Sequence, residues 1–526
     1  MSILLTSFFL FVLTVLLCIY YSFLKSYKHF QDSSIPTIRP LYAFIGLKDT
    51  VRLKKPFVKQ LTEAYHMFEP HPFFGVYNLF FRSIFVRDPE LVKKILVKDF
   101  SYFQNHGLNI FKEIEPLARH LFNLEGEEWK NLRMRMTGIF TSGKMKMMFP
   151  LVNKCAEEMK PALMEYVSSP DGFEVKDLCS RYTTDVIGST AFGVDTNSFK
   201  YPNSEFRKMG GRIFEYRWQN LLRLMVPNMP AWAVKFFKME MFSKDVMDYF
   251  MKIIKDMVKY REENNITRDD FLDLLIAMKN HTNTQKQQQN PNGTKDTAKS
   301  TTQVGDKRVR SNVEMSVELM AAQCFLFFVG GFEGTSVAIS FLLFELAQHP
   351  EIQDKVREEI LSTIEKNGGE ITYDMLKNLP YLNMVLQEIM RLYAPNGGAI
   401  IRKCNENYKI PESGAVIRKG TQVVIPLAGI HTDKKYYEKP DEFYPEHFTK
   451  EAISERPHFA YLPFGEGPRV CIAERFANMQ ILIAAIHLIK DFSFELSPKT
   501  ILPLEFLPST AIPPVKGGIW LKCKPL

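Results

Sequence analysis

The first long uncharged stretch of the chain runs from Ile3 to Leu24. As a helix this run would be about 33 Å long, which matches the hydrocarbon core of a bilayer, about 30 Å thick. No basic residue precedes it and no small-residue cleavage site follows it, which argues against a cleaved signal peptide. We therefore expect an uncleaved transmembrane anchor over residues 1–25.

The flanks of this stretch predict its orientation. Lys25 and Lys28 follow it directly, and the positive-inside rule then places the remaining chain in the cytosol. Pro36 and Pro40 stiffen the exit from the anchor, so residues 26–45 are expected to form a hinge. Residues 46–526 show no internal repeat and are expected to form one large domain.

A second apolar run, residues 314–349, contains no proline. Its apolar positions surround the helix instead of marking one face, which is typical of a buried central helix. Ser311 and Glu314 form a capping-box pattern at its start. Three glycines lie within residues 330–334, and each gives up about 1 kcal/mol relative to Ala in a helix. Either something approaches the backbone there, or the glycines form a notch for helix packing or bending.

The rest of the pattern is mainly helical. Helices are predicted over residues 146–168, 234–264, 351–366, 381–393 and 472–491, and short strands over 75–79, 83–87, 399–403, 421–426 and 517–522. Residues 279–312 are rich in Asn, Gln, Thr and Lys and lack aromatic residues, so we expect a mobile surface loop. The predicted fold class is mainly α with a minor β region.

Composition narrows the class of protein. Hydrophobic residues make up 46% of the chain, which is a globular balance. The 67 Lys and Arg exceed the 59 Asp and Glu by only 8, too few to indicate a nucleic-acid partner. The seven cysteines form no CxxC pair, which favours a reducing compartment.

The segment Phe464-Gly-Glu-Gly-Pro-Arg469-Val-Cys471 carries the clearest chemical signal. Its glycines and proline predict an irregular turn that ends on Cys471, just before an apolar helix. A helix amino terminus and Arg469 would both lower the pKa of the thiol and favour a metal-binding thiolate. A buried structural cysteine beside a turn is the alternative for any lone cysteine.

Together with further motifs in matching order, this segment resembles the haem-thiolate monooxygenases, the cytochromes P-450. The likeness is strongest to the microsomal clan-3 type, as in insect families 6 and 9, and implies a single haem domain with a long central helix. A Cys thiolate is the general haem ligand of this family. By that resemblance Cys471 is the axial ligand of the haem iron, Phe464 packs on the haem, and Arg469 belongs to the cofactor-binding set.

Other haem contacts follow from the same resemblance. Trp129 and Arg133, at i and i+4, match the W-x-x-x-R helix that holds a haem propionate, and an arginine fork suits a carboxylate. Arg402 stands where relatives place a second propionate ligand. Seen alone, the Trp129 segment could also be a plain amphipathic helix.

The pair Glu388 and Arg391 matches the E-x-x-R motif, which implies a buried structural ion pair rather than a surface one. Many relatives join this pair with an arginine, where this chain has His447. Histidine can bind a carboxylate but offers no fork, so the joint is expected to be weaker or pH-sensitive.

The glycine notch resembles the oxygen-binding groove of the family, which implies catalytic roles for Glu333 and Thr335. In most relatives a threonine hydroxyl follows the acid directly and helps deliver protons, whereas here Gly334 intervenes. One helical residue corresponds to about 100° of rotation and 1.5 Å of rise. A π-bulge could restore the register, or a water could fill the space beside Gly334; we favour the water. Family position also gives these substrate-pocket residues: Phe111, Phe325, Phe328, Phe332 and Ile401.

The resemblance implies a microsomal enzyme of the endoplasmic reticulum membrane that binds haem b and oxidises apolar small molecules with dioxygen. The chain has no nucleotide-binding glycine motif, so electrons from NADPH would arrive through a separate reductase, with cytochrome b5 as a second donor. A basic cluster around Trp129 would face that partner: Lys130, Arg135, Lys144 and Lys146. The alternatives are a haem-thiolate isomerase or dehydratase, and a haem sensor or ligand carrier without enzymatic activity.

Overall fold

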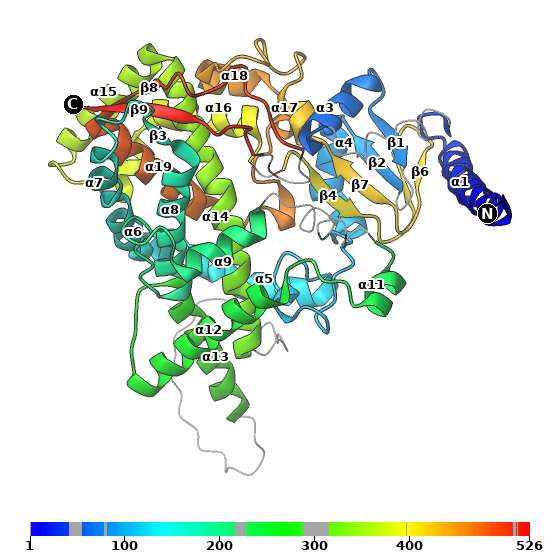
Figure 1. Cartoon of the computed structure of the whole chain (residues 1–526), viewed down its shortest axis with the longest axis horizontal. Coiled ribbons are helices and arrows are strands. Elements are labelled where there is room, and N and C mark those ends of the chain that lie inside the picture. The colour runs from blue at the N-terminus through cyan, green and yellow to red at the C-terminus, as the bar shows by residue number, and fades with distance from the viewer. Residues whose placement is uncertain are drawn as a thin grey trace, which may run out of the picture.

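The computed structural model of the chain describes residues 2–40, 55–77, 82–215, 229–287, 315–395, 397–508 and 514–526, with single positions 223, 226 and 512. Helices make up most of the body, and the strands of this described part form sheets of four, three and two strands (Figure 1). The predicted fold class, mainly α with a minor β region, is confirmed.

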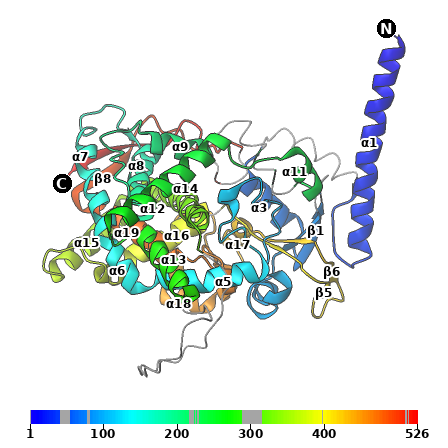
Figure 2. The same ribbon diagram turned by 90° about the horizontal axis from the view of Figure 1, so that it is seen from below.

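Helix α14 (Val317–Gln348) runs through the centre of the body, and Figure 2 shows it nearly end-on among the other helices. Its side chains are buried on all sides, as the continuous apolar pattern predicted. The helix begins after Ser316, whose hydroxyl accepts a hydrogen bond from the backbone N–H of Leu319 at 3.2 Å. The predicted cap at Ser311 and Glu314 lies outside the described residues.

The other helices of the body surround α14. Their bounds are α3 (Phe57–Met67), α4 (Pro89–Lys93), α5 (Gly126–Thr137), α6 (Ser142–Glu157), α7 (Met159–Met164), α8 (Val175–Ile187), α9 (Glu205–Phe214), α11 (Ala231–Phe237), α12 (Lys244–Asn264), α13 (Phe271–Gln287), α15 (Pro350–Lys366), α16 (Pro380–Tyr393), α17 (Leu427–His431), α18 (Lys450–Glu455) and α19 (Glu474–Asp491).

Two predicted helices are each divided in the structure. The helix predicted over 146–168 becomes α6 and α7, because Pro161 has no N–H to donate to the carbonyl of Glu157. The helix predicted over 234–264 becomes α11 and α12, and Lys238, in the left-handed conformation at φ +48°, ends the first of them.

The loop predicted over 279–312 begins later than expected. Helix α13 continues to Gln287, and Lys279 pairs with Glu262 on α12 at 2.7 Å. Lys and Gln are good helix formers, so a polar composition prevents burial without ending the helix. The remainder of the predicted loop lies outside the described residues.

The largest sheet has the strand order β1-β2-β7-β4 and lies beside the helical body (Figure 1). Its strands are β1 (Phe73–Tyr77), β2 (Arg82–Val86), β7 (Gln422–Ile425) and β4 (Ile400–Lys403). Strand β2 pairs with β7 in parallel, while β4 pairs with β7 antiparallel and sets Arg402 opposite Val423. This sheet therefore fixes the position of β4 and of Arg402 on it.

Two smaller sheets complete the β region. Strands β3 (Phe173–Glu174), β9 (Trp520–Pro525) and β8 (Phe492–Leu496) form one of them, with Phe173 opposite Leu521. Strands β5 (Tyr408–Lys409) and β6 (Val416–Ile417) form the other. The sequence pattern predicted neither β8 nor the two-residue strands.

Helix α1 (Ser2–Gln31) projects away from the body at its amino-terminal end, as Figure 2 shows. Its last turns instead join the core: Phe23 and Phe30 are buried in one cluster with Tyr77, as is Ile35 just after the helix. A Cβ added to Gly75 would lie 2.8 Å from the ring of Phe30, so β1 and α1 touch closely. The hinge predicted from residue 26 is therefore wrong for 26–31, because the apolar side chains there continue the helix onto the sheet.

By length and composition, α14 is the helix of the described residues that could cross a membrane, but 67% of its most apolar window is buried inside the protein. A core helix passes the same test, and α14 is the core helix of this fold. The anchor over residues 1–25 stays a prediction.

Candidate active site

The loop that carries Cys471 is closed by its own backbone. Gly465 and Gly467 have φ angles of +75° and +78°, in the region that favours glycine. A Cβ on Gly467 would lie 2.1 Å from the carbonyl oxygen of Leu96, so another residue would clash there. The N–H of Cys471 donates to the carbonyl of Phe464 at 2.9 Å, and α19 begins three residues later. The turn thus holds the thiol at the amino-terminal end of α19.

The Cys471 thiol has open space next to it, although protein surrounds it. The side chain has exposed surface, yet burial raises the pKa of the thiol. Backbone N–H groups at the start of α19 and the charge of Arg133 oppose this effect. The predicted net lowering of the thiol pKa is therefore wrong for the protein alone: desolvation outweighs the helix terminus, and the acting cation is Arg133. A bound metal cation would add the missing stabilisation of a thiolate.

The guanidinium of Arg469 is hydrogen-bonded to backbone carbonyls around it. Its guanidinium donates to the carbonyls of Gln104 at 3.0 Å and Leu124 at 2.7 Å, and more weakly to those of Leu121 and Phe122. It also lies 4.0 Å from the ring centre of the buried Trp129. These contacts fasten the cysteine loop to residues 104–124.

Arg402 has no such set of partners. The side chain is 2% exposed; its Nη1 donates to the Ile401 carbonyl at 2.9 Å, and its Nε is buried without a partner in the described part of the chain. Burial lowers the pKa of Arg402 to about 10. A buried guanidinium without a counter-ion is unfavourable, so an anion bound beside it would stabilise it.

His106 joins this group, and sequence reasoning missed it. Its Nδ1 lies 3.0 Å from the carbonyl of Ile401 and 3.3 Å from Nη1 of Arg402, and its ring stacks on Phe122. Burial, then Arg402 and Arg469, hold its pKa well below the usual value, so the ring is neutral. The only sequence signal was a polar turn, Gln104 to Gly107, which by itself indicates nothing about a cofactor.

Arg133, Arg402 and Arg469 converge on one region of the protein. Burial and Arg402, in that order, lower the pKa of Arg469 to about 9; Arg133 adds to this effect, and the Glu125 carboxylate opposes it without reversing it. Burial also lowers the pKa of Arg133, on α5. None of the three is in an ion pair between described residues. A thiol facing open space and several anion-deficient arginines fit haem, which carries a metal ion and two carboxylates.

Helix α14 is regular through the glycine notch, so the π-bulge considered from the sequence is absent. A Cβ on Gly330 would meet nothing within 4 Å among the described atoms, and one on Gly334 would lie 3.5 Å from the carbonyl oxygen of Pro395. Thr335 is buried at 3% exposure, one residue out of register with Gly334. The Ser336 hydroxyl donates to the carbonyl of Glu333 at 2.9 Å.

Glu333 faces a basic residue on a neighbouring helix. Lys176, near the start of α8, donates to Oε2 of Glu333 at 2.8 Å and also to Ser180 at 3.4 Å. The carboxylate is mostly buried, with its side chain 16% exposed, while the side chain of Lys176 is 31% exposed. The pair therefore links the interior of α14 with the surface of the protein.

Two of the predicted pocket residues are core residues in this structure. Phe325 and Phe328 are fully buried, and both pack against Phe250 of α12. A side chain with no exposed surface does not line an open space, so their assignment to the pocket is wrong. That assignment came from family position alone. Phe332 is 5% exposed and stacks on Phe328.

The other two predicted pocket residues are partly exposed. Phe111 lies under the ammonium of Lys235, which is 4.5 Å from its ring centre. Ile401 lies on β4 next to Arg402. Both thus keep some surface that an occupant of the site could meet.

Glu388 and Arg391 form a buried ion pair on α16. Both carboxylate oxygens accept from the guanidinium at 2.7 Å, and both side chains are 0% exposed. Arg391 also donates to the carbonyls of His431, Pro440 and Glu442. His447 contacts Glu388 through Nδ1 at 3.2 Å, and its buried Nε2 has no partner in the described chain. The pair joins α16 to the segment before the cysteine loop.

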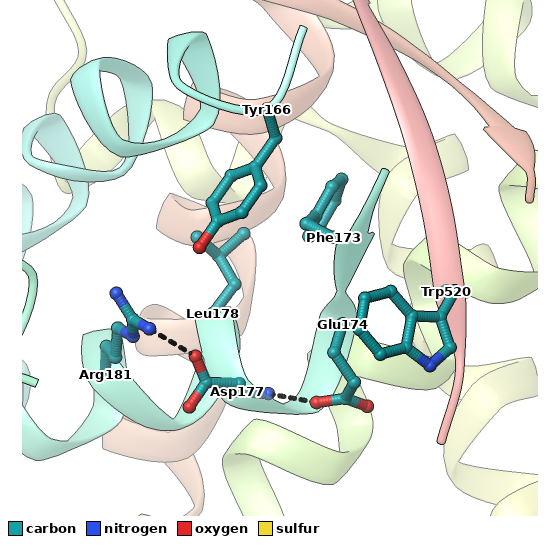
Figure 3. Close-up of a pocket in the computed structure, with 7 residues that line it drawn as sticks. All are labelled: Tyr166, Phe173, Glu174, Asp177, Leu178, Arg181 and Trp520. Atoms are coloured by element: carbon teal, nitrogen blue, oxygen red, sulfur yellow. Dashed lines mark hydrogen bonds and ion pairs between the residues drawn. The ribbon is translucent and has the colours of Figure 1, made fainter. Parts of the chain in front are cut away.

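A separate pocket lies near the carboxyl terminus, with a volume of about 240 Å³ (Figure 3). Tyr166, Phe173 and Trp520 contribute aromatic walls, and Asp177 pairs with Arg181 at 2.6 Å. Glu174 accepts from the N–H of Asp177 at 2.6 Å and so caps α8. The pocket contains none of the predicted site residues.

Comparisons with known proteins agree with this geometry. Residues 36–519 match the family model described as Cytochrome P450. The chain is 37% identical over 500 residues to "Probable cytochrome P450 6a21" of Drosophila melanogaster, covering 94% of each chain. It is 36% identical to "Cytochrome P450 6a2" of the same organism, with 95% of this chain and 96% of the relative covered.

A cockroach relative is similar over the same range. The chain is 33% identical over 509 residues to "Cytochrome P450 6k1" of Blattella germanica, covering 96% of this chain and 94% of the relative. Both the family model and the relatives extend over the central helix, the β4 arginine and the cysteine loop. The chain therefore belongs to the cytochrome P450 family, whose members are haem-dependent monooxygenases.

Proposed function

We propose that this chain is a membrane-anchored monooxygenase that binds haem b through Cys471 and inserts one oxygen atom into apolar small molecules. Its electrons come from NADPH through a separate reductase. The observation that carries the proposal is the convergence of Arg133, Arg402 and Arg469 beside the Cys471 thiol, with none of the three in an ion pair between described residues. When bound, haem supplies the oxygen and redox chemistry of the family.

The arginines have different tasks in this proposal. Arg402, with its free Nε, and Arg133 hold the haem propionates, and His106 keeps Arg402 in place. Arg469 and Trp129 support the cysteine loop from behind. Phe464 fixes the thiol through its backbone carbonyl.

Proton delivery is assigned to Glu333. Lys176 holds its carboxylate at 2.8 Å and connects it with the surface. A water beside Gly334 takes the place of the hydroxyl that most relatives have, since a polar space of this kind can hold one. Thr335 is buried and out of register, so it does not carry the proton in this scheme.

The membrane attachment rests on apolar surface. Phe9, Leu10, Leu17 and other side chains of α1 are exposed, as is expected of a helix that a bilayer covers. Helix α11 adds exposed aromatic side chains, with Trp232 at 70% and Phe236 at 77%. The proposed location is the endoplasmic reticulum membrane, with a single span and a cytosolic body.

The partner surface is the basic cluster around α5. Lys130 and Lys146 have acidic neighbours, Glu127 at 3.6 Å and Asp374 at 2.6 Å, but all of these groups remain largely exposed. Exposed pairs of this kind contribute little stability and can exchange partners. We assign this surface to the NADPH-cytochrome reductase, with cytochrome b5 as an alternative donor.

The direct test is the replacement Cys471→His in the full-length protein. The variant should still bind haem but lose the strongly red-shifted Soret band of the reduced carbonyl complex. Cys155→Ser is the matched control, because Cys155 is a thiol away from the site, and it should keep the band. Persistence of the band in Cys471→His would assign the ligand to another residue.

A second experiment separates the candidate activities. The protein is reconstituted with reductase in a membrane and given a panel of apolar substrates. A monooxygenase consumes NADPH in proportion to product. An isomerase or dehydratase forms product without NADPH, and a sensor or carrier is reduced without forming any product.

A further inference from the structure

A group of basic side chains surrounds the carboxyl-terminal end of α1, where this helix meets the large sheet. Arg82 of β2 donates from Nε to the Ser26 hydroxyl and from Nη1 to Nδ1 of His29, both at 3.2 Å. Arg418, after β6, donates to the Ser33 hydroxyl at 3.2 Å. Two arginines from distant parts of the chain thus converge on the last turns of α1 and on Ser33, two residues after its end.

In the described part of the chain, these arginines have no carboxylate partner. Neither is in an ion pair between described residues, and their recorded hydrogen bonds go to neutral groups. Burial and Arg418 lower the pKa of Arg82. Burial, Arg82 and Arg418 also lower the pKa of His29, and only Asp32 acts in the other direction. The arginines therefore repel each other and lack an anion.

The position along α1 indicates where this anion would come from. The apolar run ends at Leu24, and Ser26 and His29 follow by two and five residues, or about 3 to 7.5 Å along the axis. The headgroup layer on each side of the hydrocarbon core is about 5–7 Å thick. With residues 3–24 in the bilayer, the guanidinium of Arg82 lies within the headgroup layer.

We propose that Arg82 and Arg418 form a binding site for the phosphate of an anionic phospholipid headgroup, with Ser26, His29 and Ser33 positioning the two guanidinium groups. The arginine fork matches phosphate oxygens, and the cytoplasmic leaflet is the anionic one. Because the site joins α1 to β2 and the end of β6, a bound headgroup would stabilise the contact between anchor and body. This inference rests on the proposed membrane anchor.

The test measures lipid selectivity at the protein surface. Full-length, haem-loaded protein is placed in phosphatidylcholine vesicles that contain spin-labelled phosphatidylserine, phosphatidic acid or phosphatidylcholine, and the motionally restricted fraction is measured by electron paramagnetic resonance. We expect the anionic lipids to be favoured over phosphatidylcholine. Arg82→Gln and Arg418→Gln should each reduce that preference about fivefold, the effect of one basic residue near an anionic surface.

Matched variants keep the test specific. Lys419→Gln removes the same charge next to Arg418 without touching Ser33, and should leave the preference nearly unchanged. Arg82→Lys and Arg418→Lys keep the charge and should retain most of it, which covers the case in which a Gln variant folds poorly. Equal loss in Lys419→Gln would show a general charge effect and overturn the site.

Two further outcomes separate the sources of phosphate and the two proposals. If inorganic phosphate at equal concentration displaces the labelled lipid, the site is an oxyanion site and the assignment to lipid is overturned. Extraction with alkaline carbonate tests the anchor independently. A wild-type protein that washes off the membrane refutes the anchor, whereas a protein that stays bound without lipid selectivity refutes only this inference.

Discussion

Gly334 lies at the position of α14 where most relatives have the hydroxyl that helps deliver protons. Helix α14 is regular there, so Thr335 is rotated by about 100° from the position that a hydroxyl at residue 334 would have. Among the described residues, a Cβ at residue 334 would meet only the carbonyl oxygen of Pro395, at 3.5 Å, which is an ordinary contact. The Cβ that Gly334→Ala or Gly334→Thr adds should therefore be accommodated without a shift of these residues.

The expected stability change follows from the same contact. Replacing a glycine inside a helix gains about 1 kcal/mol with Ala, and at least about 0.3 kcal/mol with Thr. Gly331→Ala is the matched control: its Cβ would lie 2.6 Å from Cδ1 of the buried Ile187, and overpacking costs about 1–3 kcal/mol, which offsets or exceeds the same helix gain of about 1 kcal/mol. Denaturant unfolding should rank Gly334→Ala above the wild type and Gly331→Ala at or below it.

The functional assay is the amount of product formed per NADPH in the reconstituted system. Thr335→Ala should leave this ratio nearly unchanged, and Gly334→Thr should raise it or leave it unchanged. A positioned proton-transfer group typically contributes about 10²–10⁴-fold. A loss of that size in Thr335→Ala would refute the reasoning, because it would show that Thr335 delivers the proton from its buried position.

Three other predictions concern buried titratable side chains. Arg391→Met leaves the Glu388 carboxylate buried without its cation, so it should cost about 3–5 kcal/mol and abolish the yield of folded haem protein. Arg402→Gln removes a cation that lacks an anion, so the haem-free protein should unfold no more easily than the wild type, while haem dissociates at least about tenfold faster in a transfer assay to apomyoglobin. Burial lowers the pKa of His120 to about 4, so between pH 4 and 6.5 the unfolded state binds the extra proton and stability falls as the pH falls. His120→Asn should reduce this loss by up to about 3 kcal/mol in unfolding titrations, and an unchanged pH profile would assign the loss to other groups.

The central helix and the strands next to it were predictable because their signals are local. The continuous apolar pattern of α14 and the apolar helix after Cys471 require no knowledge of the rest of the fold. Strands β3, β5 and β6 were not predictable, since two residues are too few for an alternating pattern and form a strand only beside a distant partner. Strand β8 was missed because it follows α19 directly, with no turn residues between them.

The chemistry of the site was predictable in its residues but less so in their environment. Arg469 stands two residues from Cys471 in sequence, yet its guanidinium is taken by carbonyls of residues 104 and 121–124. Arg133, far away in the chain, acts on the thiol instead. The pKa of a buried group depends on such tertiary contacts and on desolvation, neither of which a sequence motif contains.

The pairing of β3 with β9 determines when the three-stranded sheet can form during synthesis. Phe173 pairs with Leu521, so a strand near the first third of the chain finds its partner only about 350 residues later. At roughly 5–20 residues per second, translation leaves β3 unpaired for about 20–70 s. In the proposed anchored form, α1 would hold the nascent chain at the membrane during that time and so limit encounters with other exposed strand edges. A stop codon that removes only the last seven residues would delete β9, which lies between β3 and β8. Strand β3 would then have no partner in this sheet.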